Sequence, residues 1–204
     1  MMEEFRLFDY SSDLVILSFL LLFLSALGVP WLEVSISSPG DALYFLLLPW
    51  VLVIPLHEGL HALTAKLLGA RVRFGVTTVD KLVLVTYVAI ETPLLARKYI
   101  LVSLSPLILS FVALTLAWLL HSNFWALVYI FNTAGMAGDF LTTLVLLRMP
   151  SDAEVFDDGT TLRSDSMVPP PYPSWVSSVL KVAVVLVFLF IVLKARIEVV
   201  VEKG

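Results

Sequence analysis

Five long apolar runs, separated by shorter polar segments, dominate the pattern of hydrophobic and polar positions along the chain. They cover about residues 14–32, 42–68, 100–120, 124–147 and 176–194. A helix that crosses the hydrocarbon core of a bilayer needs about 20 predominantly apolar residues, and each run is close to that length or longer. The pattern therefore predicts an all-α integral membrane protein with about five transmembrane helices.

The segment between the second and third runs follows a different pattern. From Arg71 to Thr92, valine and threonine are frequent, polar and apolar residues partly alternate, and Asp80 and Lys81 interrupt the apolar positions. Such a pattern is typical of two short strands joined by a turn. We therefore expect a small β-hairpin between the second and third spans, at the membrane face.

Residues 149–175 are first acidic and then rich in proline. This composition is typical of an extended connector without a core of its own. We find no internal repeat in the 204 residues. The chain is thus expected to form a single polytopic membrane domain over residues 1–204, with a core at about 42–158, the connector at 149–175 and a C-terminal span at 176–194.

Composition and charge agree with a membrane protein. Hydrophobic residues make up 59% of the chain and charged residues only 15%, whereas a soluble domain has roughly half and about a quarter. The net charge of −4 gives no basic footprint for nucleic acid, so nucleic acid is not expected as a partner. Because the chain has no cysteine, a metal site must use histidine and carboxylate ligands.

Positive charge predicts the orientation of the spans. Most lysine and arginine residues lie in the connections after the second and fourth runs: Arg71, Arg73, Lys81, Arg97 and Lys98 in the first, and Arg148 and Arg163 in the second. The positive-inside rule places both connections on the cytoplasmic side. Lys194, Arg196 and Lys203 disagree with this for the fifth span, so its orientation is left open.

The sequence HEGLH, from His57 to His61, lies inside the second apolar run. Positions i and i+4 share one face of a helix, so the two imidazoles can bind one ion. Glu58, beside that face, is suited to act as the general base on a metal-activated water, as in the H-E-x-x-H motif. Ionisable residues are rare in membrane spans, so three within five residues indicate a functional site.

A catalytic zinc usually has a third protein ligand. A third histidine at the spacing of the extended motifs is excluded, because positions 64 and 67 are Thr and Leu. Asp139 is the only acidic residue inside the last three apolar runs, and we expect it to be the third ligand. Asn132, two turns before Asp139, could bind a substrate backbone or an oxyanion, although a structural bond between helices is an equally good interpretation.

These segments resemble a known family. HEGLHALTAKLLGARVRFG, FNTAGMAGD two spans later, and the basic strand-like segment between them resemble intramembrane zinc metalloproteases of the site-2 protease type. The resemblance covers about residues 50–158 and is closer to short membrane proteins of a zincin peptidase family of unknown function. It implies that His57, His61 and Asp139 bind Zn²⁺, that Glu58 activates water, and that cleavage occurs within the membrane.

We therefore expect a zinc metallopeptidase of the cell membrane, with its active site in the bilayer toward the cytoplasmic side and a membrane-embedded or membrane-proximal peptide as substrate. Two alternatives stay open. A non-hydrolytic metal-binding or transport protein should carry polar ligands along a path through several helices, whereas here they gather at one depth. A catalytically silent scaffold would not need Glu58, which is dispensable for holding a metal.

Overall fold

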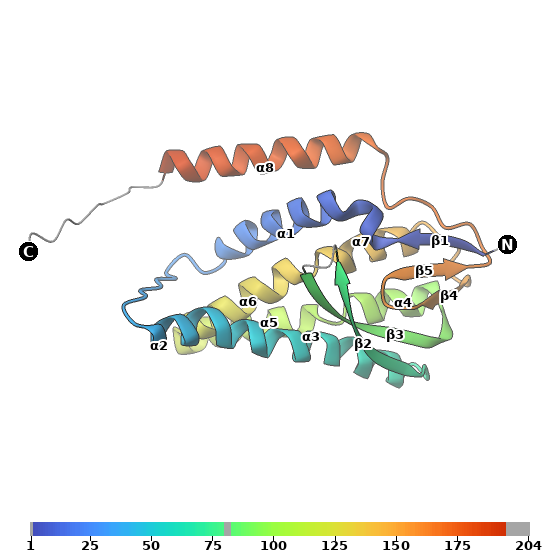
Figure 1. Ribbon diagram of the computed structural model, residues 1–204, viewed down its shortest axis with the longest axis horizontal. Coiled ribbons are helices and arrows are strands. Elements are labelled where there is room, and N and C mark those ends of the chain that lie inside the picture. Colours follow the sequence, from blue (N-terminus) through green and yellow to red (C-terminus); the bar gives the residue numbers. More distant parts are fainter. Residues whose placement is uncertain (1, 80–82, 195–204) are drawn as a thin grey trace, which may run out of the picture.

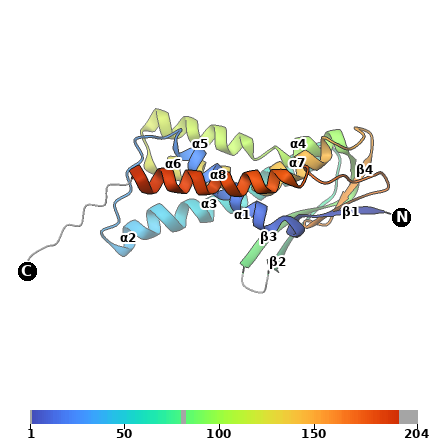
Figure 2. The ribbon, with the colours of Figure 1, turned by 90° about the horizontal axis from the view of Figure 1, so that it is seen from above.

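The computed structural model describes residues 2–79 and 83–194 and is mostly helical. The longer helices are α1 (Ser11–Ala26), α3 (Leu48–Leu67), α5 (Leu107–Leu120), α6 (Asn123–Gly135) and α8 (Trp175–Lys194). The shorter ones are η1 (Leu7–Tyr10), α2 (Pro39–Ala42), η2 (Leu43–Leu47), α4 (Ala96–Ser103) and α7 (Ala137–Leu146). The helices run along the long axis of the molecule, and a small sheet lies at one end (Figures 1 and 2).

The third and fourth apolar runs each form two helices instead of the single continuous helix that we predicted. The first break separates α4 from α5 just before Pro106, which has no N–H to continue the helical hydrogen bonds. The second break lies at Met136, whose φ of −72° and ψ of 3° leave the helical conformation. Because α4 packs against α7 and α5 against α6, the two breaks lie next to each other.

The described residues form one antiparallel sheet of five strands in the order β1-β5-β4-β3-β2. The strands are β1 (Glu3–Arg6), β2 (Val72–Val79), β3 (Val83–Leu95), β4 (Glu154–Asp157) and β5 (Thr161–Ser164). The hairpin expected between the second and third spans is confirmed as β2 and β3, which pair from Val72 opposite Ile90 to Val79 opposite Val83. Its expected turn at Asp80 and Lys81 lies outside the described residues.

The sheet is larger than the two-stranded hairpin that we predicted. Segment 149–175, expected to be an extended connector without a core of its own, supplies β4 and β5, and the N-terminal residues supply β1. The physical reason is burial: Val155 of β4, Leu162 of β5 and Phe5 of β1 join a core with residues of α4 and α7. The sheet thus covers the end of the helices that carries α4 and α7.

Three helical segments are long and apolar enough to cross a membrane: Leu7–Ala26, Pro39–Leu67 and Ala96–Leu120. Two shorter apolar helices, Ala137–Leu146 and Trp175–Phe190, accompany them in the described part of the chain. The structure thus has three candidate spans by length and composition, and the five-span topology stays a prediction.

Candidate metal centre

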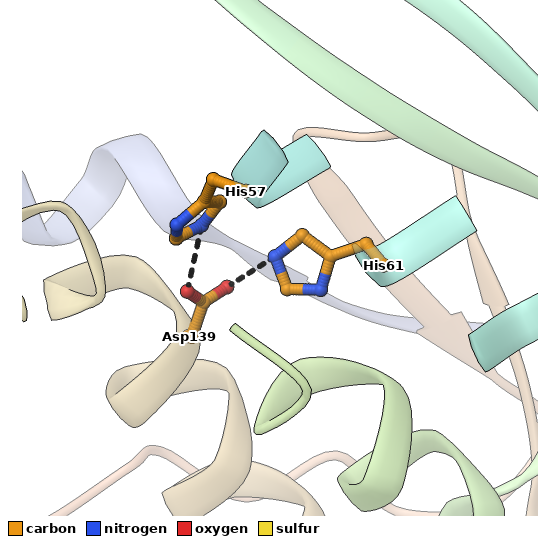
Figure 3. Close-up of side chains that lie close together, drawn as sticks. All are labelled: His57, His61 and Asp139. Atoms are coloured by element: carbon orange, nitrogen blue, oxygen red, sulfur yellow. Dashed lines mark ion pairs between the residues drawn. The ribbon is translucent and has the colours of Figure 1, made fainter. Parts of the chain in front are cut away.

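Three side chains from two helices converge where the sequence predicts a metal site (Figure 3). His57 and His61 lie one turn apart on α3, and Asp139 lies in the first turn of α7. His57 Nε2 is 3.2 Å from Asp139 Oδ2, and His61 Nε2 is 3.2 Å from Asp139 Oδ1. Each residue offers one ligand atom, and these three atoms lie within 4.8 Å of one another. This spacing allows the three residues to hold one metal ion.

Asn132 fixes the orientation of the His57 ring. Its side-chain N–H groups donate to Pro106 O at 2.9 Å and to Ser110 Oγ at 2.8 Å. Its Oδ1 is therefore left as the acceptor for His57 Nδ1–H at 3.0 Å. With the proton of the neutral ring on Nδ1, the lone pair of His57 Nε2 faces Asp139.

A backbone carbonyl plays the same part for the second histidine. His61 Nδ1 is 2.8 Å from Val102 O, which can only accept, so His61 Nδ1 carries the proton. Val102 O receives no helical hydrogen bond from position 106, because Pro106 has no N–H. It accepts instead from Ser105 N–H at 3.1 Å, from Ser105 Oγ at 2.7 Å and from His61. The break between α4 and α5 thus provides the acceptor that orients His61.

The Asp139 carboxylate faces the Nε2 atoms of both histidines, and its Oδ2 has no further hydrogen-bond partner among the described residues. Protonated imidazoles make this contact as ion pairs. Neutral imidazoles present lone pairs to the carboxylate and can make it only with a cation between them. Two imidazoles and one carboxylate, with a position left open for water, are a ligand set that suits zinc.

A cavity of about 210 Å³ opens beside the three ligands. Glu58 lines it, so the expected general base shares the cavity with the expected metal ligands. The other walls come mainly from β3, α4, α7 and the turn between β4 and β5; they include Tyr87, Val88, Tyr99, Val102, Gly135, Thr142, Asp157 and Leu162. Glu58 is therefore placed to act on a molecule in this cavity.

The substrate or oxyanion role expected for Asn132 stays a prediction. Asn132 is fully buried and is not among the described residues that line the cavity. Its polar atoms contact His57, Pro106 and Ser110 instead. In the structure, Asn132 therefore acts on the metal site through His57.

Sequence reasoning missed Tyr99 and Asp157, which both line the cavity. The Tyr99 hydroxyl donates to Asp157 Oδ2, and Gly159 N–H donates to Asp157 Oδ1 at 2.8 Å. Burial raises the pKa of Asp157 from 3.8 to about 6, although these hydrogen bonds act in the opposite direction. The acidic segment predicted to be a solvated connector thus places a carboxylate at the site.

Comparison with known proteins agrees with this geometry. Residues 50–153, half of the chain, match the family model described as "Putative zincin peptidase". The chain is also 49% identical over 195 residues to an "Uncharacterized 24.7 kDa protein in gap 5'region" of Pyrococcus woesei. This match covers 96% of this chain and 88% of that protein. No solved structure matches the chain. The site-2 protease type stays a prediction, but the expected zincin family is confirmed: the chain belongs to the family described as "Putative zincin peptidase".

Proposed function

We propose that this protein is a membrane-embedded zinc metallopeptidase of the site-2 protease type, which hydrolyses peptide bonds in membrane-embedded or membrane-proximal substrates. The observation that carries the proposal is that Glu58 lines the same cavity as His57, His61 and Asp139. A site that only stores or transports a metal has no need for a further, non-ligating carboxylate beside the ligands.

Each residue has a defined part in the proposed reaction. His57, His61 and Asp139 hold the zinc, and the hydrogen bonds from the two Nδ1 atoms keep both Nε2 atoms directed at it. Zinc, when bound, lowers the pKa of a water molecule toward neutrality and polarises the scissile carbonyl. Glu58 accepts a proton from the attacking water and returns it to the departing amine.

Exposed apolar side chains support a location in the bilayer. On α3, for example, Trp50, Val51 and Leu63 are each more than half exposed, and on α8 the same is true of Val182, Leu186 and Phe190. Soluble proteins rarely expose apolar patches of this extent. Lipid contacting these faces would remove this surface from water, and the five apolar runs would then all lie in the membrane.

Basic residues support a cytoplasmic location for the sheet. Arg71, Arg73 and Arg163 lie in or next to β2 and β5, and Arg97 and Arg148 lie at the ends of α4 and α7 nearest the sheet. The positive-inside rule assigns this end to the cytoplasm. His57 and His61 lie in the half of the helical segment Pro39–Leu67 nearer the sheet, so the active site would open toward the cytoplasmic side of the bilayer.

The proposal is tested with the full chain purified in detergent and reconstituted into lipid vesicles. We expect about one zinc per chain for the wild type, a clear loss for Asp139→Ala, and retained zinc for Glu58→Gln, because Glu58 is not a ligand. Mass spectrometry of a mixture of synthetic transmembrane peptides then measures cleavage. The wild type and the control Glu91→Gln, which changes an exposed strand carboxylate, should cleave, and Glu58→Gln should not.

Either of two results would contradict this function. A zinc-loaded Glu58→Gln variant that cleaves as fast as the wild type would remove Glu58 from the mechanism. A wild type that binds zinc but cleaves none of the peptides, in vesicles or in detergent, would favour a non-hydrolytic metal-binding or transport protein.

A further inference from the structure

The hydrogen bond between Tyr99 and Asp157 joins the sheet to the helix that supports the metal site. Tyr99 is only 5% exposed and lies on α4, and Asp157 is the last residue of β4. The Asp157 carboxylate also accepts the Gly159 N–H, which fixes it to the turn between β4 and β5. The first turn of α4 continues directly from β3, and the N–H groups of Ala96 and Arg97 donate to the segment just before β4, at 2.9 and 3.2 Å. The Tyr99–Asp157 hydrogen bond adds a side-chain link to the sheet further along the helix.

The same face of α4 contacts two of the three expected ligands. Tyr99, Val102 and Ser103 are three and four residues apart, so they lie on one side of the helix. Val102 O accepts from His61 Nδ1, and Ser103 Oγ donates to the backbone oxygen of Asp139 at 2.9 Å. A displacement of α4 would therefore change the hydrogen bonds that orient His61 and support Asp139.

The length of α4 makes an external contact important. The helix has only eight residues and is separated from α5 by the break before Pro106, so α5 does not hold it as one continuous rod. Its buried residues, such as Ala96 and Val102, pack against neighbours, and backbone hydrogen bonds hold its first turn beside β4. The Tyr99 hydroxyl extends this attachment by a side-chain hydrogen bond from the buried face of α4 to the sheet.

We propose that Tyr99 and Asp157 are positioning residues of the metal centre: their hydrogen bond holds α4 against the sheet and thereby keeps His61 and Asp139 in the geometry that binds zinc. The inference rests on the proposed function, because it takes zinc as the ion bound by His57, His61 and Asp139. Groups that orient metal ligands typically change metal affinity by 10- to 100-fold when they are removed.

The competing explanation is that the pair only satisfies its own buried polar groups. Removing one partner alone does not separate the two explanations, because it leaves the other buried and unpaired. Asp157→Asn keeps an oxygen for Gly159 N–H, and its amide can donate to the Tyr99 oxygen, so the link persists without the charge. The double variant Tyr99→Phe with Asp157→Asn then removes the link without leaving a buried charge.

A matched control is available in a second tyrosine–aspartate pair. Tyr172 OH donates to Asp13 Oδ2 at 2.7 Å, and Asp13 also accepts from Ser177 Oγ at 2.7 Å. This pair joins α1 to the segment before α8, and none of its residues lines the cavity in the described part of the chain. Tyr172→Phe thus removes the same kind of hydrogen bond away from the metal centre.

The experiment measures zinc affinity by chelator competition with the full chain in detergent, and the thermal unfolding of each metal-free protein. We expect the double variant to bind zinc at least about tenfold more weakly than the wild type. Asp157→Asn and Tyr172→Phe should stay within about threefold, since they keep the link or lie outside the site. The visible spectrum of the cobalt(II)-loaded double variant should also change, because that spectrum reports coordination geometry.

Wild-type zinc affinity in the double variant would overturn the inference, as would an equal loss of affinity in Tyr172→Phe, which would show general loosening of the fold. If the double variant does not fold, the zinc affinity of Asp157→Asn decides. This variant keeps the link to Tyr99, so a tenfold loss of its zinc affinity would also overturn the inference. These results leave the proposed peptidase intact. A wild type that binds no zinc would instead overturn the proposed function and this inference together.

Discussion

Replacing Asn132 with alanine tests how far the metal centre depends on the orientation of His57. Asn132 is fully buried and makes three hydrogen bonds, to His57 Nδ1, Pro106 O and Ser110 Oγ. Alanine removes all three. His57 Nδ1–H is then left without this partner, whereas Pro106 O still accepts from the N–H groups of Leu109 and Ser110, and the Ser110 hydroxyl keeps its bond with Thr133.

The expected magnitude has two parts. A buried polar group that loses its partner costs about 1–3 kcal/mol, so the unpaired His57 Nδ1–H lowers the free energy of unfolding by roughly that amount. Loss of the group that orients a histidine ligand weakens metal binding by about 10- to 100-fold. At about 1.4 kcal/mol for each factor of ten, this corresponds to roughly 1.4–2.8 kcal/mol of zinc binding energy.

The assay is zinc affinity by chelator competition, measured beside chemical unfolding of the metal-free protein. Ser110→Ala is the matched control, because it removes one acceptor of Asn132 and leaves the contact between Asn132 and His57 in place. We expect this control to lose about 1 kcal/mol of stability. Its zinc affinity should remain close to that of the wild type.

One result would refute this reasoning. If Asn132→Ala binds zinc as tightly as the wild type but hydrolyses peptides much more slowly, then Asn132 acts on the substrate or on an oxyanion, as the sequence also allowed. Movement of Asn132 toward the cavity during the reaction would then be required, because it does not line the cavity in this structure.

Two further outcomes follow from the cavity. Gly135 lines the cavity, and a β-carbon added there would have no atom within 4 Å, so Gly135→Leu should block peptide cleavage while zinc content is kept. Gly59 is equally open but lies outside the cavity lining, so the control Gly59→Leu should cleave normally. Equal activity of the two variants would contradict binding of the peptide in this cavity. The raised pKa of Asp157, about 6 against 3.8, means that its charged form destabilises the fold above about pH 6, by roughly 3 kcal/mol, and that this effect is relieved as the pH falls toward 4. As the pH falls from 6 to 4, the thermal stability of the wild type should therefore rise relative to that of Asp157→Asn. Parallel plots of stability against pH for the two proteins would show that folding does not raise the pKa of Asp157.

The candidate metal ligands could be picked out from the sequence because they break the local pattern. An apolar run has few reasons to contain His57, His61 or Asp139, and the spacing of the two histidines fixes them on one helical face. The structure brings all three ligand atoms within 4.8 Å of one another. Rarity and helical period were sufficient here, even though the two helices are far apart in the sequence.

The supporting bonds were harder to predict because hydropathy measures only how apolar a segment is. The third run is mostly apolar, so it predicts one helix, although Pro106 cannot donate the helical hydrogen bond to the Val102 carbonyl four residues earlier. That proline was a usable signal for a break. The contact of the Val102 carbonyl with His61 of another helix depends on tertiary packing and could not be read from the same segment.

Asp157 illustrates a different limit, which concerns strands of only four residues. β4 contains Val155 as its one fully buried apolar residue, too little for an alternating pattern to be recognised. Once pairing with β5 places Val155 on the inner face, the period of two places Asp157 on that face as well, directed toward the cavity. The decisive information is therefore the pairing of strands far apart in the chain, such as β1 with β5, and an acidic segment that looks solvated can still supply a carboxylate to a buried site.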